Sequence, residues 1–330
     1  MLYIFEFTIF FILFFSAYWM YVIIRSFFYQ LAEAPRAKAA HLPAKQPNTK
    51  IVRIFLLIIL AIIFGTIFYG SFIESNLIVE KNVPINLGKT AEHENIKIVY
   101  LSDFHVGPYK QADYVERVVK AALAEKPDFI FLGGDYIMGR EIWSHYLTPF
   151  EQFKPYAGKI FAVTGNHEFN NSYYHSDFKD KTATLRKMFA DYGIKILDNE
   201  SVLLESNGQK FYLSGIKDLW TEQADIAGTF AQIENKNLPK ILLSHNPDVI
   251  LQEAASQFDF IISGHTHGGQ IRLPFIGSVP PIPDELGRDY DKGLFKLGNN
   301  QIYISSGLGE SGPRARLFNP PELTVITLDL

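Results

Sequence analysis

The chain of 330 residues contains 31 Lys and Arg, 35 Asp and Glu and no cysteine, which corresponds to a formal net charge of −4. The lack of cysteine excludes disulfides, thiolate nucleophiles and cysteine-ligated metal sites, so any metal must be held by His, Asp, Glu or Asn. Residues 1–73 contain six basic and two acidic side chains, whereas residues 74–330 contain 25 and 33, a net charge of −8. This acidic excess disfavours sequence-independent nucleic-acid binding, so no nucleic-acid partner is expected, and no protein partner is identifiable.

Two long apolar runs lie near the N-terminus. Residues 7–24 form a run of 18 residues without a charge, and residues 54–73 form a second run of 20. As helices they would extend roughly 27–30 Å, which is about the thickness of the hydrocarbon layer of a membrane. The alternative for each run is a buried core helix, and a cleaved signal peptide is disfavoured because no basic residue precedes the first run. The sequence predicts a membrane anchor over residues 1–73, with transmembrane helices at about 7–24 and 54–73.

All six basic residues of the anchor lie in the loop over residues 25–53. Short loops rich in Lys and Arg stay on the cytoplasmic side, and attraction to anionic lipids favours the same side. We therefore expect a multi-pass protein of the cell inner (cytoplasmic) membrane, with the lipid bilayer as a partner and the chain after Ile73 outside the cytoplasm. This orientation requires the first run to cross the membrane. Residues 74–95 are polar and are interpreted as a linker or a first strand.

Beyond residue 95, short apolar runs alternate with helical patterns. The runs at 96–101, 129–132, 160–163, 241–243 and 258–262 end in polar clusters and are typical of buried strands. Between them, Val115, Val118 and Val119 recur at helical spacing behind Asp113 as the expected N-cap, and residues 185–192 repeat this pattern before a glycine. Residues 293–305 predict a hairpin and residues 323–328 a last strand. The order of elements predicts an α/β domain over residues 96–330 with its chemistry at strand ends.

Histidine, acidic and amide side chains gather where these strands end. A single histidine beside a strand is usually a core residue that hydrogen-bonds to its neighbours. Burying several unpaired carboxylates and imidazoles would be costly, whereas a bound cation neutralises the acids and uses the ring nitrogens. The sequence therefore predicts a metal site with the candidate ligands Asp103, His105, Asp135, Asn166, His245, His265 and His267.

Five short motifs resemble the signature of the calcineurin-like metallophosphoesterases. In chain order they are Asp103-Phe104-His105, Gly134-Asp135, Gly165-Asn166-His167-Glu168, His245 and Gly264-His265-Thr266-His267. The sequence around them, including residues 306–309 and 319–322, is similar to the membrane-associated bacterial branch of that family, the YaeI/YkuE-like phosphodiesterases. The resemblance covers about residues 95–330. It implies a four-layer α/β/β/α sandwich with a dinuclear metal site.

The resemblance also implies a role for each of these residues. Asp103, His105 and His267 would hold a first metal, Asn166, His245 and His265 a second, and Asp135 would bridge the two. The two ions would be divalent or trivalent, and Mn, Fe and Zn all accept these ligands. A metal-bound hydroxide would attack phosphorus.

Three neighbouring positions bear on the same chemistry. His167 would be the catalytic residue that protonates the leaving oxygen or stabilises the transition state. Glu168 would orient His167 or lie at the surface of a turn. Met138 stands where the phosphoprotein phosphatases of this family have a second aspartate, which argues against protein-phosphatase activity.

Further segments are candidates for substrate contact. Residues 169–176, with His175, are expected either to line the site or to form a surface loop, and Arg314 and Arg316 are candidate phosphate contacts or solvated surface residues. The apolar residues 273–283 are interpreted as an exposed lip for acyl chains or the bilayer, with a core-packing loop as the alternative.

We therefore predict a membrane-anchored dinuclear phosphoesterase that hydrolyses a phosphodiester or pyrophosphate bond in a lipid or lipid-linked substrate. The alternatives are a UDP-2,3-diacylglucosamine pyrophosphatase of lipid A synthesis, an inactive membrane receptor or scaffold on the same fold, and a nuclease.

Overall fold

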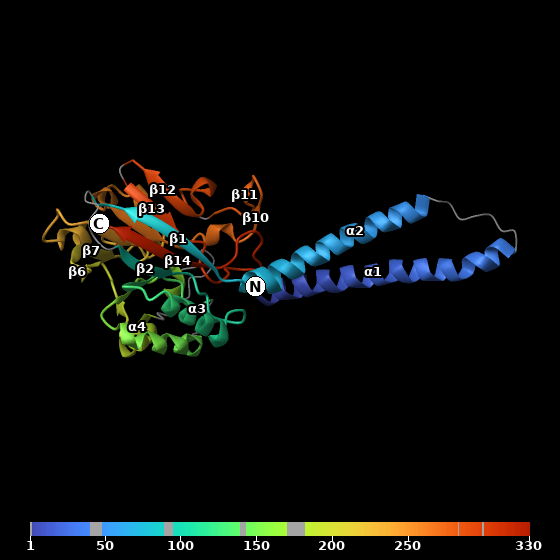
Figure 1. Ribbon diagram of the computed structural model, residues 1–330, viewed down its shortest axis with the longest axis horizontal. Coiled ribbons are helices and arrows are strands. Elements are labelled where there is room, and N and C mark those ends of the chain that lie inside the picture. The colour runs from blue at the N-terminus through green and yellow to red at the C-terminus, as the bar shows by residue number, and fades with distance from the viewer. Residues whose placement is uncertain are drawn as a thin grey trace.

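A computed structural model describes residues 2–39, 48–88, 95–138, 143–169, 182–282, 284–298 and 300–330. Two helices, α1 (Leu2–Ala39) and α2 (Asn48–Phe68), extend together from one end of a folded domain (Figure 1). After α2 the chain continues through a π-helical turn (Tyr69–Ile73) and a 3₁₀ turn (Glu74–Asn76). Both helices are longer than the sequence predicts.

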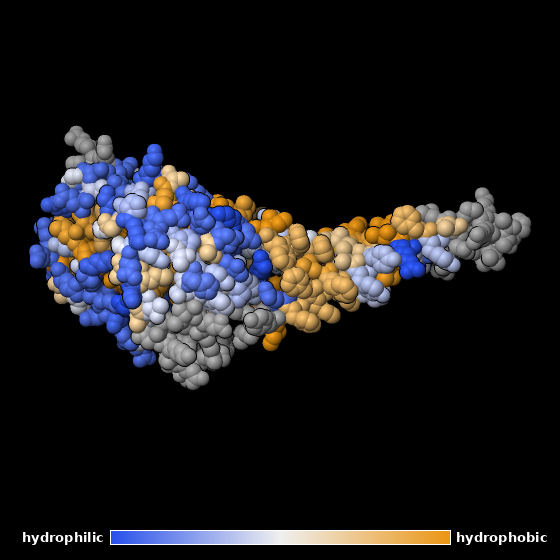
Figure 2. Space-filling view, turned by 90° about the horizontal axis from the view of Figure 1, so that it is seen from below, coloured by the Kyte–Doolittle hydropathy of each residue, from blue (hydrophilic) through white to orange (hydrophobic). Residues whose placement is uncertain are grey.

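The two helices expose their apolar side chains. Residues 4–30 and 49–76 are each long and apolar enough to cross a membrane, and only 11% of the most apolar stretch of the first and none of the second is buried. Apolar side chains dominate both helices where they leave the domain (Figure 2). A buried core helix, the alternative for both runs, is therefore wrong.

The first sheet has six strands in the order β1-β14-β2-β3-β4-β5. Its members are β1 (Val79–Asn86), β2 (Ile96–Leu101), β3 (Phe129–Leu132), β4 (Ile160–Ala162), β5 (Lys195–Ile196) and β14 (Glu322–Asp329). All neighbours are parallel except β14 and β2. Residues 74–95 are interpreted from the sequence as a linker or a first strand, and part of this segment forms strand β1. Strand β1 pairs with β14 along its whole length, so the domain begins before residue 96.

The second sheet also has six strands, in the order β12-β13-β9-β8-β7-β6. These are β6 (Glu200–Ser206), β7 (Gln209–Gly215), β8 (Lys240–Leu243), β9 (Phe260–Ser263), β12 (Gly293–Leu297) and β13 (Asn300–Ile304). The expected hairpin is formed by β12 and β13, whereas the hairpin of β6 and β7 was not predicted. A separate two-stranded sheet joins β10 (Arg272–Leu273) to β11 (Gly277–Ser278).

The two large sheets pack face to face, and helices cover their outer faces. Tyr100, Phe131 and Phe211 belong to the apolar cluster between the sheets. Helices α3 (Ala112–Ala124) and α4 (Thr182–Asp191), with a long 3₁₀ segment (Ser144–Tyr156), cover the first sheet. Helix α5 (Ile226–Ala231) and 3₁₀ turns at Pro247–Leu251 and Glu253–Gln257 cover the second. The predicted α/β/β/α sandwich is confirmed, although Gln111 rather than Asp113 is the N-cap of α3.

Candidate metal centre

Every predicted metal ligand lies just beyond the carboxyl end of a strand. Two donors follow β2, one follows β3, one follows β4, one follows β8 and two follow β9, in the order Asp103, His105, Asp135, Asn166, His245, His265 and His267. All seven side chains are buried, with at most 7% exposed. The two sheets meet at this edge, so residues up to 164 positions apart in the sequence gather in one place.

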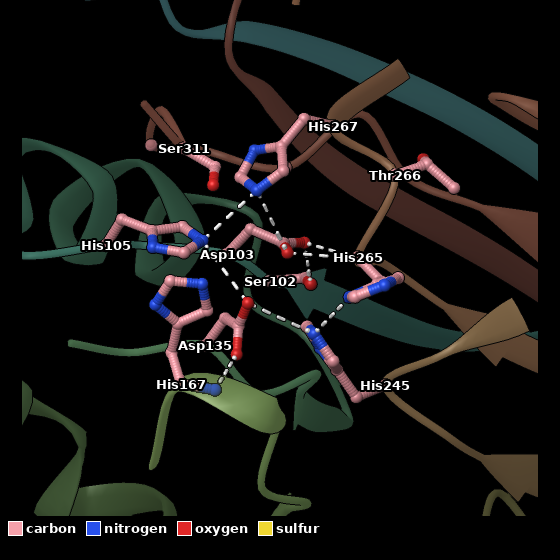
Figure 3. A network of polar contacts seen from close by, with 12 residues as sticks. Ser102, Asp103, His105, Asp135, His167, His245, His265, Thr266, His267 and Ser311 are labelled. Atoms are coloured by element: carbon pink, nitrogen blue, oxygen red, sulfur yellow. Dashed lines mark hydrogen bonds and ion pairs between the residues drawn. The ribbon is translucent and has the colours of Figure 1, made fainter. Parts of the chain in front are cut away.

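Asp135 stands at the centre of the cluster (Figure 3). Its Oδ2 lies 3.3 Å from His105 Nε2 and 3.2 Å from His245 Nε2. The ligand atoms of Asp103, His105, Asp135 and His267 form one group within 4.8 Å, and those of Asp135, His245 and His265 form a second. The two groups share Asp135, which is the arrangement expected of a bridging carboxylate.

Two pairs of imidazole nitrogens face one another within these groups. His267 Nε2 lies 3.1 Å from His105 Nε2, and His265 Nδ1 lies 3.1 Å from His245 Nε2. Two lone pairs at this distance repel unless a proton or a cation lies between them. His245 Nδ1 is 2.8 Å from the carbonyl oxygen of Gly133, which places a proton there and leaves Nε2 to act as a ligand. The donor set therefore fits Mn, Fe or Zn ions, which accept nitrogen and carboxylate oxygen.

The backbone at five of the ligands is left-handed. The φ angles are 56° at Asp103, 43° at His105, 52° at Asp135, 70° at His265 and 52° at His267. Residues other than glycine rarely adopt this region, and each such residue costs on the order of 1–3 kcal/mol. The folded domain therefore stores strain at the site in order to turn these side chains towards one another.

Charges in the cluster shift the proton affinities of its members. Burial alone would raise the pKa of Asp135, but His245 and His167, with hydrogen bonds from His105 and His245, hold it well below its ordinary value. Burial opposes protonation of His245, yet Asp135 and Asp103 raise its pKa well above the usual range. Without a cation, His245 is thus protonated and paired with Asp135, so a metal must displace this proton in order to bind.

Glu168 is fully buried beneath the metal cluster. Its carboxylate accepts backbone N–H bonds from four residues: Asp135 (2.9 Å), Tyr136 (2.8 Å), Ile137 (3.3 Å) and Gly165 (2.8 Å). Burial and the charge of Asp135 raise the pKa of Glu168 to about 7. The surface position considered for Glu168 is wrong, and its oxygens clamp the loop after β3 instead of contacting the His167 ring. Sequence reasoning missed this role because it depends on the approach of two separate loops.

His167 lies at the edge of the cluster and is half-buried. Its backbone N–H donates to Asp135 Oδ1 at 2.9 Å, and its ring packs edge-on against His105 with 4.6 Å between centroids. Burial lowers the pKa of His167 to about 3, so the ring is neutral at neutral pH.

A cavity of about 350 Å³ opens over the metal cluster. Asp135, Asn166, His167, His265 and His267 line its polar side. The apolar part of its lining includes Trp220, Ile271, Pro280, Pro281, Ile282 and Pro313. Two residues that contact His265 were not predicted from the sequence: Trp220 packs edge-on against its ring at 4.6 Å, and Asp284 Oδ1 lies 3.2 Å from its Nε2.

The structure does not place the predicted substrate contacts Arg314 and Arg316 in the cavity. Arg316 is fully buried, and its guanidinium donates to carbonyl oxygens of residues 306, 307, 309 and 319, so the prediction that it binds phosphate is wrong. The guanidinium of Arg314 lies over the rings of Phe72 and Tyr109, beside the end of α2 rather than in the cavity wall. His175 lies outside the described residues.

The fold and the site together define the class of protein. Residues 96–269 match the family model of the calcineurin-like phosphoesterases, and the chain belongs to this family. It is therefore a metal-dependent hydrolase of phosphoric esters, with a buried cluster of residues suited to holding metal ions.

Particular relatives are similar over most of the chain. The metallophosphoesterase YkuE of Bacillus subtilis is 30% identical over 239 residues, which cover 71% of this chain and 79% of YkuE. The phosphodiesterase YaeI of Escherichia coli is 30% identical over 238 residues, or 70% of this chain and 82% of YaeI. Among solved structures, the NAD nucleotidase of Haemophilus influenzae superposes with a TM-score of 0.40 at 16% identity and covers 66% of this chain and 46% of that one.

Proposed function

We propose that this protein is a membrane-anchored dinuclear phosphoesterase that hydrolyses a phosphodiester or pyrophosphate bond in a lipid or lipid-linked substrate. The two ligand groups that share Asp135 support two metal ions, and the similarity to the phosphodiesterase YaeI supports a phosphodiester. The two exposed apolar helices support an anchor in the membrane.

The residues of the chain would divide the work as follows. Asp103, His105 and His267 would hold one ion, Asn166, His245 and His265 would hold the other, and Asp135 would be shared by both. Bound ions of this kind lower the pKa of water and neutralise charge on phosphoryl oxygens. Because the pKa of His167 is lowered, we assign to its neutral ring the donation of an N–H hydrogen bond to the leaving oxygen. This role favours transition-state stabilisation over transfer of a proton from an imidazolium.

One observation carries the assignment of a lipid substrate: the cavity beside the metal ligands has an apolar wall. Ile271, Pro280, Pro281 and Ile282 line the same cavity as His167. A phosphodiester with only polar substituents would leave this wall in contact with water or with polar groups. An acyl or prenyl chain would instead bury it, and burial contributes about 25 cal/mol for each Å² of apolar surface.

Turnover of bis-p-nitrophenyl phosphate by the purified full-length protein with added Mn²⁺ tests the phosphoesterase. Asp135→Asn removes charge from the shared ligand, and His167→Ala removes the proposed donor, so we expect losses of roughly 10²–10⁴-fold for His167→Ala and a larger loss for Asp135→Asn. His145→Ala, at an exposed histidine outside the site, is the matched control and should retain wild-type turnover. No turnover with any divalent metal would contradict the enzyme and favour a receptor or scaffold.

Lipidomics of a deletion strain tests the substrate class. Accumulation of a phosphorylated lipid is the expected result, and an unchanged lipid profile would argue against a lipid substrate.

A C-terminal alkaline-phosphatase fusion tests the orientation. An active fusion is expected from the basic loop between the helices. An inactive fusion would place the domain in the cytoplasm, where the UDP-2,3-diacylglucosamine pyrophosphatase reaction takes place.

A further inference from the structure

The turn between β10 and β11 presents large apolar side chains to solvent. Phe275 has a relative exposure of 108% and Ile276 of 64%, and Leu273 and Val279 are also exposed. The run from Leu273 to Ile282 contains no charged residue. Side chains of this size are seldom left in water as a group unless they contact a partner or a membrane.

The backbone of this turn gives no local reason for an aromatic residue. Phe275 follows Pro274 and has a φ of 68°, and the N–H of Ile276 donates to the carbonyl oxygen of Leu273 at 3.2 Å. These are the features of a type II turn, in which glycine or asparagine is favoured at the position of Phe275. The aromatic ring is therefore explained neither by the turn nor by packing in the core.

Backbone hydrogen bonds connect this hairpin to the end of the second helix. Arg272 N–H donates to the carbonyl oxygen of Leu317 at 2.9 Å, and Leu317 N–H donates to that of Gln270 at 3.0 Å. The next residue back, Arg316, donates its N–H to the carbonyl oxygen of Gly70 at 3.0 Å. The hairpin therefore lies one backbone segment away from the last turns of the candidate membrane span.

The same segment joins the helix end to the metal site. Glu74 accepts the backbone N–H of Asn319, and the Asn319 side chain donates to the carbonyl oxygen of His267 at 2.7 Å. Buried Lys110 adds an ion pair with Glu310 at 3.2 Å and a hydrogen bond to the carbonyl oxygen of Ser75. These contacts fix the position of the hairpin and of the metal site relative to the end of α2. Strands β10 and β11 lie at the end of the domain from which both helices extend (Figure 1).

We propose that the tip formed by residues 273–276 inserts into the lipid bilayer that the two helices cross. The bilayer is the occupant that the structure favours because the tip is uncharged, apolar and tied to the end of a membrane-length helix. The residues that flank the hairpin, Gln270 and Ile271 on one side and Pro280 to Ile282 on the other, line the metal cavity. Insertion thus brings the cavity to the membrane surface, where a lipid headgroup reaches the metals. This inference rests on the proposed membrane anchor and lipid substrate.

Labelling at a single cysteine tests the insertion directly, because the natural sequence contains none. The full-length protein carries Ile276→Cys with an NBD fluorophore and is reconstituted into phosphatidylcholine–phosphatidylglycerol vesicles. The matched control is Lys210→Cys, an exposed position on β7. Strand β7 lies at the opposite end of the domain from the helices (Figure 1). We expect blue-shifted NBD emission that acyl-chain doxyl lipids quench at position 276 and not at position 210. Equal accessibility of both probes to aqueous iodide, or a blue shift without doxyl quenching, which indicates a protein partner or a second copy, would overturn the inference.

A functional comparison separates this inference from the proposed function. Phe275→Asn keeps a residue suited to the left-handed turn but removes the ring. We expect unchanged turnover of bis-p-nitrophenyl phosphate in detergent and a fall of about tenfold in kcat/KM on phospholipid in vesicles. If the wild type turns over the soluble ester but no phospholipid, the lipid substrate fails while the probe result still decides insertion. If Phe275→Asn matches the wild type on phospholipid that the wild type hydrolyses, insertion has no role in substrate access and the functional part of the inference fails.

Discussion

The clamp formed by Glu168 predicts a large effect of a nearly isosteric substitution. Each oxygen of its carboxylate accepts two backbone N–H bonds: Oε2 from Asp135 and Gly165, and Oε1 from Tyr136 and Ile137. Glu168→Gln replaces one oxygen by an NH₂ group, which faces two N–H donors whichever way the amide is turned. Two buried donors then lose their acceptor.

The magnitude follows from these two donors. Each unsatisfied buried donor costs about 1–3 kcal/mol, so their sum is about 2–6 kcal/mol. Removing a buried carboxylate whose pKa is raised to about 7 offsets part of this cost, and we expect a net destabilisation of about 2–4 kcal/mol. For a domain of this size that corresponds to a fall in Tm of roughly 5–15 °C. Displacement of Asp135 should also weaken metal binding about 10–100-fold.

Thermal unfolding of the full-length protein in detergent, with EDTA and with Mn²⁺, measures both effects. Glu151→Gln is the control, because Glu151 is exposed and forms a surface ion pair with Lys154 at 2.7 Å, and its Tm should stay within about 1–2 °C of the wild type. The pKa of Glu168 in the fold, about 7, lies above the ordinary value of 4.5. The native state therefore binds more protons than the unfolded state between these pH values, so the Tm advantage of the wild type over Glu168→Gln in EDTA should grow as pH falls from 7 to 5. An unchanged Tm together with unchanged Mn²⁺ affinity would refute the clamp.

Three further predictions concern the metal site. Removing metal with EDTA should lower Tm, and Mn²⁺ at 100 times its Kd should restore about 2.7 kcal/mol of stability. A Tm that changes neither with EDTA nor with Mn²⁺ would contradict a resident metal. Because carboxylates raise the pKa values of His245 and His265, metal affinity should fall as pH drops, with proton release in calorimetry at pH 7; binding without proton release would contradict these shifts. Gly264→Ala would place a Cβ 2.3 Å from Asp103 Oδ2 and should weaken Mn²⁺ binding at least tenfold, whereas Gly158→Ala has open space and should cost only stability; equal affinities would show that Asp103 can move.

The strands that carry the metal ligands were predictable because they are buried on both faces. Strands β2 and β3 have the predicted bounds, since a short, continuous apolar run between polar clusters is typical of a strand that is covered on both sides. Strand β1, whose early residues are exposed, and the partly exposed β6 lack such runs. Strand β1 is held in the sheet by hydrogen bonds to β14, and β6 by hydrogen bonds to β7. The local sequence does not indicate these pairings.

The chemical types of the metal ligands were likewise evident from the sequence, but their arrangement was not. Imidazole and carboxylate groups after successive strands indicate a metal whatever their exact separation. The left-handed backbone at Asp135 and His265, the clamp by Glu168 and the contact of Asp284 with His265 depend on loops that meet only in the folded chain. Arg316 shows the same limit, because a Gly- and Pro-rich sequence suggests an exposed turn although the guanidinium is fully buried.

By itself the sequence determined the donor chemistry, the α/β order of elements and the two apolar helices, since these follow from residue types and their periodicity. Only the tertiary structure decided that Asp135 lies between two groups of ligands, that apolar side chains line the same cavity as the metal ligands, and that a hairpin with an uncharged tip lies one backbone segment away from the end of α2. These are relations between segments up to about 250 residues apart. Distances of that kind are set by the packing of two sheets, and no local pattern in the chain records them.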